Sequence, residues 1–290
     1  MNHIWIILIG ALVASSCSIV GCFLVLRKMS MIGDAISHSV LPGIVIAFLL
    51  SGTRDSSVMV FGAAIIGIIT VFLIQMFQNN GVQSDASIGV VFTALFAVGV
   101  VLISLFTRQV DLDLDCVLYG EIAYAPWDTL EVGGMALGPK AVWGVGSVFL
   151  LNLLVIGIFY KQFKLCSFDP AMAAALGIPV MFFHYLLMSL VSLTTVSAFE
   201  SVGAILVVGM IIVPAATAYL LTDKLSRMIV YSMIIGIMSS ILGYYIAYLL
   251  DASIAGCMIT VAGLLFMITL FISPKHGVLF KILRLKRLAV

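Results

Sequence analysis

Long apolar runs dominate this sequence, and they restrict the possible folds more than any other feature. A helix that crosses a membrane needs about 20 mostly apolar residues. Nine segments meet this requirement, at residues 4–26, 30–50, 56–77, 86–106, 139–160, 178–197, 199–221, 227–249 and 253–273. Their apolar residues are continuous rather than alternating with polar ones, which favours helices over a transmembrane β-barrel. We therefore predict an all-α polytopic membrane bundle of about nine spans, within a range of eight to ten.

The composition agrees with a membrane protein and excludes several other classes. Hydrophobic residues make up 63% of the 290 residues and charged residues only 9%, against about 25% in soluble domains. A soluble domain, a disordered chain and a nucleic-acid binder all need more charge than this, and the formal net charge is only +1. The five cysteines form no C-x-x-C pair, so neither a disulfide framework nor a thiolate metal site is indicated.

The lysine and arginine positions predict how the chain is oriented in the membrane. Positive residues concentrate in cytoplasmic loops. With the N-terminus outside and the C-terminus inside, eleven of the fourteen lie inside, although the loop 78–85 should be inside and carries none. A secretory signal has positive residues before its apolar core, whereas Arg27 and Lys28 follow it. We therefore expect a retained first helix in a single transmembrane domain over 1–290.

The segments outside the spans differ in charge. The long segment 107–138 is expected outside, and the basic segment 274–290 should form a cytoplasmic tail. The alternating Asp111, Asp113 and Asp115 are more typical of a solvated loop face than of a metal site. A contact between this loop and an external partner stays open.

The segment 161–177 is expected to carry a short helix at the cytoplasmic surface. Ser167 or Asp169 can cap a helix, and Pro170 suits its first turn. A run rich in alanine follows, and Gly177 suits the end of the helix.

Two ionisable residues in the second span are the first functional candidates. Such groups inside a membrane cost roughly 2.5–3.5 kcal/mol each on insertion scales. Asp34 and His38 are four residues apart and share one helix face. Their oxygen and nitrogen atoms can hold a divalent ion, and they suit Mn, Fe or Zn better than Cu(I). Pro42, with Gly43, should kink the helix just beyond them. The spacing alone leaves two interpretations open. The pair either handles a metal ion or a proton, or it packs as an intrahelical pair whose charges neutralise each other.

Glu200 and His184 are the other ionisable residues predicted within the membrane. The stretch 178–221 is too long for one crossing, so it should divide near Phe199, Glu200 and Ser201. Glu200 is then either a ligand or gate that faces the bundle interior, or a cap at a helix start, where a carboxylate is favoured. A histidine such as His184 more often packs with a hydrogen bond than acts in function.

The enzyme motifs that a membrane protein of this kind could carry are absent from the sequence. No G-x-x-x-x-G-K-[ST] occurs, so the chain does not itself cradle ATP phosphates. No H-E-x-x-H occurs either. Gly33-Asp34 resembles half of an intramembrane aspartyl protease site, but no other span supplies the second aspartate, because Asp251 lies at a helix end. We therefore expect no catalytic activity.

Three motifs occur in an order and spacing that match one family over nearly the whole chain. They are Gly33–Gly43 (GDAISHSVLPG), Phe168–Gly177 (FDPAMAAALG) and Glu200–Ala218 (ESVGAILVVGMIIVPAATA). They resemble motifs of the permease subunits of ABC transporters that take up manganese, zinc or iron. Leu118–Glu121 (LYGE) also fits, and the run 111–121 that ends in it is most similar to the manganese permeases.

The resemblance implies a transporter built from several subunits. Its partners would be cytoplasmic ATP-binding subunits, a second permease subunit in a homo- or heterodimer, and an extracellular metal-binding lipoprotein. The chain would be the multi-pass permease of an ATP-driven importer in a bacterial plasma membrane. It would move Mn²⁺ by alternating access, with Zn²⁺ or Fe²⁺ as the alternative cargo, and would bind no permanent cofactor.

The resemblance also implies roles for individual residues. Asp34, His38 and Glu200 would line or coordinate the metal path, with His184 as a weaker candidate. The residues that couple the permease to the ATPase would be Phe168, Asp169, Ala173, Leu176 and Gly177. Hydropathy places Asp34 and His38 in the inner half of their span and Glu200 near the outer end of its own. Either the spans are displaced in depth, or these residues act at successive points of the path.

Two alternatives from other classes remain at this stage. A carrier or channel driven by an ion gradient could use Asp34 and His38 as a proton relay. A purely structural or assembly role is the third possibility. Substitution of Asp169 or Leu176 separates the ATP-driven importer from the gradient-driven carrier, because the carrier does not need the coupling segment.

Overall fold

Helices make up nearly all of the structure, a computed structural model that describes residues 2–52, 56–106, 122–132 and 135–273. The helices are α1 (Asn2–Leu26), α2 (Met31–Ser39), α3 (Leu41–Ser51), α4 (Ser56–Asn79), α5 (Ser84–Phe106), α7 (Lys140–Ile158), α8 (Tyr160–Phe168), α9 (Pro170–Ala175), α10 (Val180–Val202), α11 (Ala204–Leu221), α12 (Leu225–Leu250) and α13 (Ile254–Ile272). The strands are β1 (Thr129–Val132) and β2 (Met135–Pro139).

Within the described residues, nine helical segments are long and apolar enough to cross a membrane. They confirm the nine predicted runs, with α2 and α3 together forming the second. The largest difference from the predicted bounds lies between the sixth and seventh spans, because α10 continues to Val202 and the break lies at Gly203. Gly203 has φ 80° and ψ 163°, a conformation that is essentially restricted to glycine. Hydropathy could not locate this break, since the residues around it are mostly apolar.

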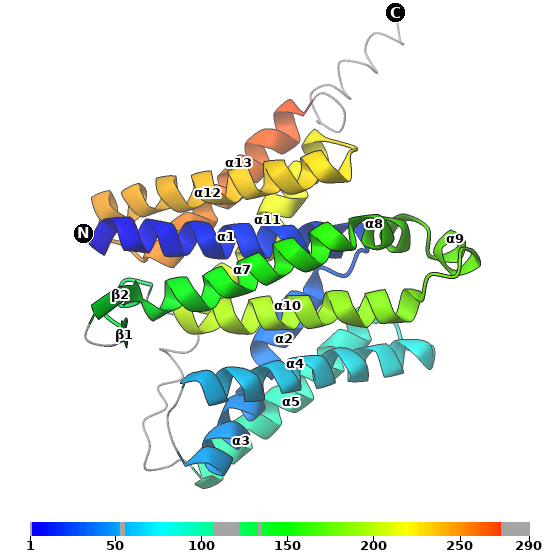
Figure 1. The fold of residues 1–290 in the computed structure, drawn as a ribbon, viewed down its shortest axis with the longest axis horizontal. Helices are drawn as coiled ribbons and strands as arrows, with labels where there is room; N and C mark the ends of the chain where they lie inside the picture. Colours follow the sequence, from blue (N-terminus) through cyan, green and yellow to red (C-terminus); the bar gives the residue numbers. More distant parts are fainter. Residues whose placement is uncertain (1, 53–55, 107–121, 133–134, 274–290) are drawn as a thin grey trace, which may run out of the picture.

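Helix α1 lies at the centre of the bundle (Figure 1). It packs against α7, α10, α11 and α12. Of the most apolar 18-residue stretch of each helix, 78% is buried in α1 and 17% in α5. Helices α12 and α13 lie on one side of α1, while α3, α4 and α5 form the opposite side of the bundle (Figure 1). The start of α1 and the β1–β2 pair lie at one end, named here the hairpin end; α8 and α9 lie at the other, the α9 end.

Small and polar side chains allow the central helices to pack closely. A Cβ atom on Gly21 would overlap the backbone carbonyl oxygen of Ile211, so α1 and α11 touch backbone to backbone. The buried Asn152 of α7 donates from Nδ2 to Ser16 Oγ in α1 (3.1 Å) and to Thr194 Oγ1 in α10 (2.7 Å). In lipid, close packing and interhelical hydrogen bonds drive helix association, because the hydrophobic effect between spans is lost.

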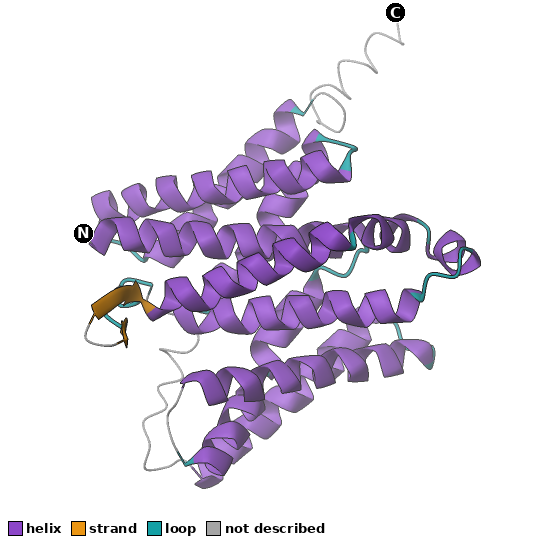
Figure 2. Ribbon diagram, viewed as in Figure 1, coloured by secondary structure: helices purple, strands orange, loops and turns teal. Residues whose placement is uncertain are grey.

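The β1–β2 pair is an element that the sequence analysis did not predict (Figure 2). The two strands pair antiparallel within the segment that was expected only to be a loop. The Gly133-Gly134 dipeptide between them is a hairpin signal that could have indicated the pairing. The three aspartates at 111, 113 and 115, the Leu118–Glu121 motif and the basic tail 274–290 lie outside the described residues.

The short helix predicted in 161–177 is confirmed as α9. Of the two caps considered, Asp169 is the one used, and its Oδ1 accepts a hydrogen bond from the Met172 backbone N–H (2.9 Å). Pro170 occupies the first turn, as expected. Gly177 follows the helix with a φ of 77°, the left-handed conformation that ends many helices.

Candidate metal site and coupling segment

The second span is interrupted directly after the Asp34–His38 motif. α2 ends at Ser39, α3 begins at Leu41, and Pro42 lies in the first turn of α3. Proline has no backbone N–H, so the carbonyl oxygen of His38 loses the donor that a continuous helix would provide. Ser39 Oγ lies 2.7 Å from Thr70 Oγ1 of α4, which anchors the end of α2. The predicted kink is therefore present, and it leaves a main-chain acceptor beside the pair.

Asp34 and His38 form an intrahelical pair that remains accessible. His38 Nε2 lies 3.5 Å from Asp34 Oδ1, and the two side chains are 35% and 31% exposed. Close charge-assisted hydrogen bonds measure about 2.7–2.9 Å, so this pair is loose. Both side chains keep ligand atoms available for an ion.

Helix α5 packs against this motif. The His38 ring lies beside Phe92 and Phe96, with ring centroids 5.9 and 6.3 Å away. A Cβ atom on Gly99 would sit 2.9 Å from Pro42 Cδ, so the glycine makes room for the proline at the break. The aromatic rings hold the imidazole in place and provide no competing ligand.

The positions along α10 show how Glu200 relates to the pair. Ile36 of α2 and Ser192 of α10 both approach Gly67 of α4, so α2 and α10 meet at that level. Glu200 follows Ser192 by eight residues, which is about 12 Å along a helix axis. Its backbone therefore lies closer to the hairpin end than the level at which α2 crosses α10.

The helix boundaries exclude one interpretation of Glu200. It lies in the last turn of α10, and the residue that caps α11 is Gly203. Glu200 therefore does not stand at a helix start, and the idea that it caps one is wrong. The helix dipole does not favour a carboxylate in a last turn. The structure does not describe the side chain of Glu200. Among the side chains that are described, no three His, Cys, Asp or Glu residues are grouped closely enough to hold a metal ion.

His184 lies away from the pair, on the α9 side of the bundle. It precedes Ser192 by eight residues, again about 12 Å along α10. Its Nδ1 atom lies 3.4 Å from Arg27 Nη1. Arg27 also donates from Nε to Ser167 Oγ in α8 (3.0 Å). From the sequence, Arg27 indicated only the orientation of the chain, because its position just after an apolar run gives no signal of these contacts.

The segment from α8 to α9 presents apolar side chains outside the membrane spans. Phe168, Met172 and Leu176 are 55%, 52% and 62% exposed. Ala173 is completely buried and packs into the core. A group of exposed apolar side chains outside the candidate spans is typical of a surface that contacts another protein or the membrane. We name Phe168, Met172 and Leu176 the α9 patch.

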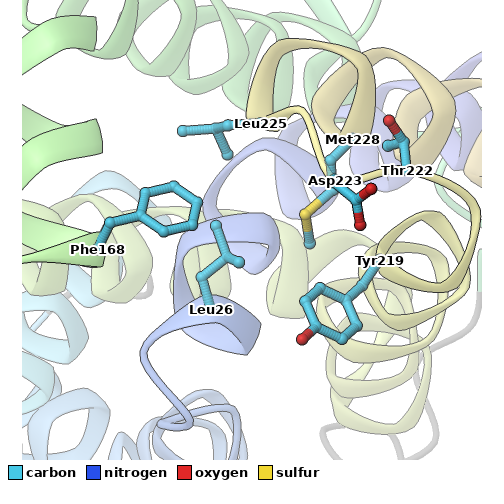
Figure 3. A pocket seen from close by; sticks show the side chains of 7 residues that line it. All are labelled: Leu26, Phe168, Tyr219, Thr222, Asp223, Leu225 and Met228. Carbon is cyan, nitrogen blue, oxygen red and sulfur yellow. The ribbon is translucent and has the colours of Figure 1, made fainter.

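A cavity of about 230 Å³ lies next to the α9 patch (Figure 3). Phe168 and Leu26 point into it from α8 and α1 (Figure 3). The remaining lining residues come from the ends of α11 and α12 and the turn between them: Tyr219, Thr222, Asp223, Leu225 and Met228. One carboxylate among apolar groups does not make a metal site. The cavity was not foreseen, because its lining residues are far apart in sequence.

Comparison with known proteins identifies relatives over nearly the full chain. Residues 2–273 match the family described as the ABC 3 transport family. The chain is 52% identical over 280 residues to the manganese transport system membrane protein MntD of Bacillus subtilis, covering 97% of this chain and 95% of that protein. It is 44% identical over 284 residues to the zinc transport system membrane protein TroD of Treponema pallidum, covering 98% and 77%.

A solved structure has the same fold. The structure of PsaBC from Streptococcus pneumoniae in complex with Fab matches with a TM-score of 0.79 at 36% identity, covering 97% of this chain and 94% of that one. The sequence motifs, the helical segments and these relatives all agree with the resemblance found from the sequence. The chain is therefore a multi-pass membrane permease and belongs to the ABC 3 transport family.

Proposed function

We propose that this chain is the membrane permease of an ATP-driven importer of Mn²⁺. The observation that carries the proposal is the loose, accessible Asp34–His38 pair at the break in a membrane span. The 52% identity to a manganese transport protein over 97% of the chain supports the choice of cargo. The chain itself hydrolyses no ATP, and a separate subunit supplies that activity.

The ion passes the candidate ligands at successive points of the path. Mn²⁺ approaching from the hairpin end meets Glu200 first and then the level of Asp34 and His38. The two side chains of the pair do not complete the octahedral, oxygen-rich coordination that Mn²⁺ prefers. Further ligands come from the His38 carbonyl, from water and from a second permease subunit packed against the accessible side of α2. His184 binds Arg27 and takes no part in coordination.

The preference for Mn²⁺ does not follow from affinity. An Asp/His/Glu set binds Zn²⁺ more tightly than Mn²⁺ or Fe²⁺, and the relative TroD is named as a zinc transport protein. Selectivity therefore comes from the delivering lipoprotein or from site geometry. Zinc or iron import by the same route is the alternative.

The α9 end is cytoplasmic and receives the ATP-binding subunits. The α9 patch supplies the apolar contact, while Ala173 anchors α9 to the core and Asp169 and Gly177 fix its two ends. The N-terminus and the hairpin end then face outward, toward the metal-binding lipoprotein. A ligand shifts a conformational equilibrium only by its differential affinity for the two states, so ATP bound to the partner supplies the bias that moves Mn²⁺.

Metal uptake in cells tests this function. Cells that lack their own importer receive the complete transporter with wild type, His38→Ala or the control His3→Ala, and Mn, Zn and Fe are supplied separately. We expect His38→Ala to lower Mn uptake by roughly tenfold or more, because removal of one metal ligand or its support typically costs 10–100-fold. His3→Ala removes a histidine at the hairpin end and should retain uptake.

Three results would contradict the proposal. Uptake that persists with an inactive ATPase would favour a gradient-driven carrier. Unchanged uptake in Asp34→Ala would favour a structural role. A larger accumulation of Zn or Fe than of Mn by the wild type would reassign the cargo.

A further inference from the structure

Arg27 connects three helices at the α9 end of the bundle. Its guanidinium group, just beyond the end of α1, donates to Ser167 Oγ of α8 (3.0 Å) and lies 3.4 Å from His184 Nδ1 of α10. Since a guanidinium has no acceptor atoms, His184 must accept through Nδ1. Burial lowers the pKa of Arg27 from its ordinary value, although an arginine remains charged at neutral pH.

This half-buried cation has no acidic partner among the ion pairs that the structure describes. Its Nη2 atom has no hydrogen-bond partner, and neither does His184 Nε2. An apolar side chain would fill this position without the desolvation cost of a charge. The hydrogen bonds to two different helices are what the arginine adds.

On one side, Arg27 belongs to the short joint between α1 and α2. Lys28 has a φ of 57°, and the Met29 backbone N–H donates to the Leu24 carbonyl (3.0 Å), a left-handed helix ending closed by its own hydrogen bond. The Ile32 backbone N–H in turn donates to the Met29 carbonyl (3.1 Å). The joint is short and internally bonded, so a displacement of Arg27 moves the start of α2, which carries Asp34.

On the other side, Arg27 holds the base of the coupling segment. Ser167 donates to the Phe163 carbonyl (2.7 Å) while it accepts from Arg27. The Phe163 ring is completely buried, with its centroid 5.7 Å from that of Phe23 in α1 and 5.4 Å from that of Phe183 in α10. Directly after Ser167 come Phe168 of the α9 patch and the cap of α9.

We propose that Arg27 is the positioning residue that transmits movement of the coupling segment, through Ser167, to α2 and its Asp34–His38 pair. This inference rests on the proposed function, since it assigns a route between the ATPase contact and the metal path. Arginine suits the role because its planar fork reaches Ser167 and His184 together, whereas the lysine ammonium is a single point of charge.

The test measures Mn²⁺ transported per ATP hydrolysed by the complete transporter, with its ATPase subunits, in proteoliposomes. The variants are Arg27→Met, which keeps the apolar stem, Arg27→Lys, which keeps the charge, and the control Lys28→Met at the exposed neighbouring cation. We expect Arg27→Met to assemble and hydrolyse ATP at the basal rate while the ratio falls roughly tenfold, within the range that substitutions along coupling routes produce. Arg27→Lys should restore part of the ratio, and Lys28→Met should match wild type.

A double-mutant comparison identifies the route. Ser167→Ala should lower the ratio, and adding it to Arg27→Met should lower the ratio no further than Arg27→Met alone, because Arg27→Met already removes the Arg27–Ser167 hydrogen bond. A wild-type ratio in Arg27→Met, additive losses in the double variant, or losses of transport and hydrolysis in parallel with thermal stability would each overturn the inference. A wild-type transporter that moves no Mn²⁺ would overturn the proposed function and the inference with it, whereas the preceding results leave the proposed function intact.

Discussion

Gly203 separates two membrane spans through its backbone conformation alone. With φ 80° and ψ 163°, it ends α10 and allows α11 to begin at the next residue. Its place in the chain also explains why Glu200 lies in a last turn and not at a helix start. One glycine therefore determines that Glu200 belongs to the end of α10 and not to the start of α11.

Replacement of this glycine should destabilise the protein. A non-glycine residue held in such a conformation costs about 1–3 kcal/mol, so Gly203→Ala should lower the midpoint of thermal unfolding in detergent. Gly146→Ala is the matched control, since a Cβ atom added there meets nothing within 4 Å. Gly146 lies within α7, so Gly146→Ala should leave the free energy of unfolding unchanged or raise it by up to about 1 kcal/mol. Equal midpoints for the two variants would show that Gly203 is under no constraint.

At the scale of an element, the second span is divided into two short helices. The break after Ser39 deprives the His38 carbonyl of its helical donor, and Gly99 of α5 makes room for Pro42. A continuous helix would be the simpler way to satisfy its backbone in lipid, where each unpaired polar group is costly. The break is therefore expected to serve the ion rather than stability.

Restoring the missing donor tests this view. Pro42→Ala allows an N–H group to bond the His38 carbonyl and joins α2 to α3. We expect Mn uptake to fall about tenfold, equivalent to ~1.4 kcal/mol, while thermal stability stays the same or rises. Leu50→Ala, at a side chain that is 84% exposed near the end of α3, is the control and should retain uptake. Full uptake in Pro42→Ala would mean that the carbonyl and the break are dispensable.

At the scale of the whole molecule, the two ends of the bundle are built from different elements. The α9 end has exposed apolar side chains outside any candidate span, and the cavity of Figure 3 lies beside them. The hairpin end has the β1–β2 pair and the start of α1. This asymmetry suits a protein that binds different partners on the two sides of a membrane.

A charge placed in the α9 patch should block assembly without unfolding the bundle. Leu176→Glu puts a carboxylate into an apolar contact, and loss of the ATPase subunits on co-purification is the expected result. A buried unpaired charge at an interface costs about 2–5 kcal/mol, so binding should fall at least about thirtyfold. Leu250→Glu, at the end of α12 near the hairpin end, is the same change at the opposite end and should leave co-purification intact. Retention of the ATPase by Leu176→Glu would place the docking surface elsewhere.

Local physics accounts for the features that could be predicted from the amino-acid order. Span number follows from apolar run length, because a bilayer requires each crossing to satisfy its own backbone. The α2–α3 break and the cap of α9 follow from Pro42 and Asp169 in the same way. The shared face of Asp34 and His38 needs only the helical period.

Packing between distant segments accounts for the features that could not be predicted. Arg27 meets Ser167 and His184 because α1, α8 and α10 converge, although 140 and 157 residues separate the partners. The level of Glu200 relative to Asp34 depends on where α2 crosses α10, and the Phe168 cavity depends on the ends of four helices. Apolar side chains of a span face lipid as well as protein, as the little-buried α5 shows. Apolar sequence therefore does not show which neighbour buries a helix, since dispersion contacts are alike for most apolar partners. These placements required the folded chain.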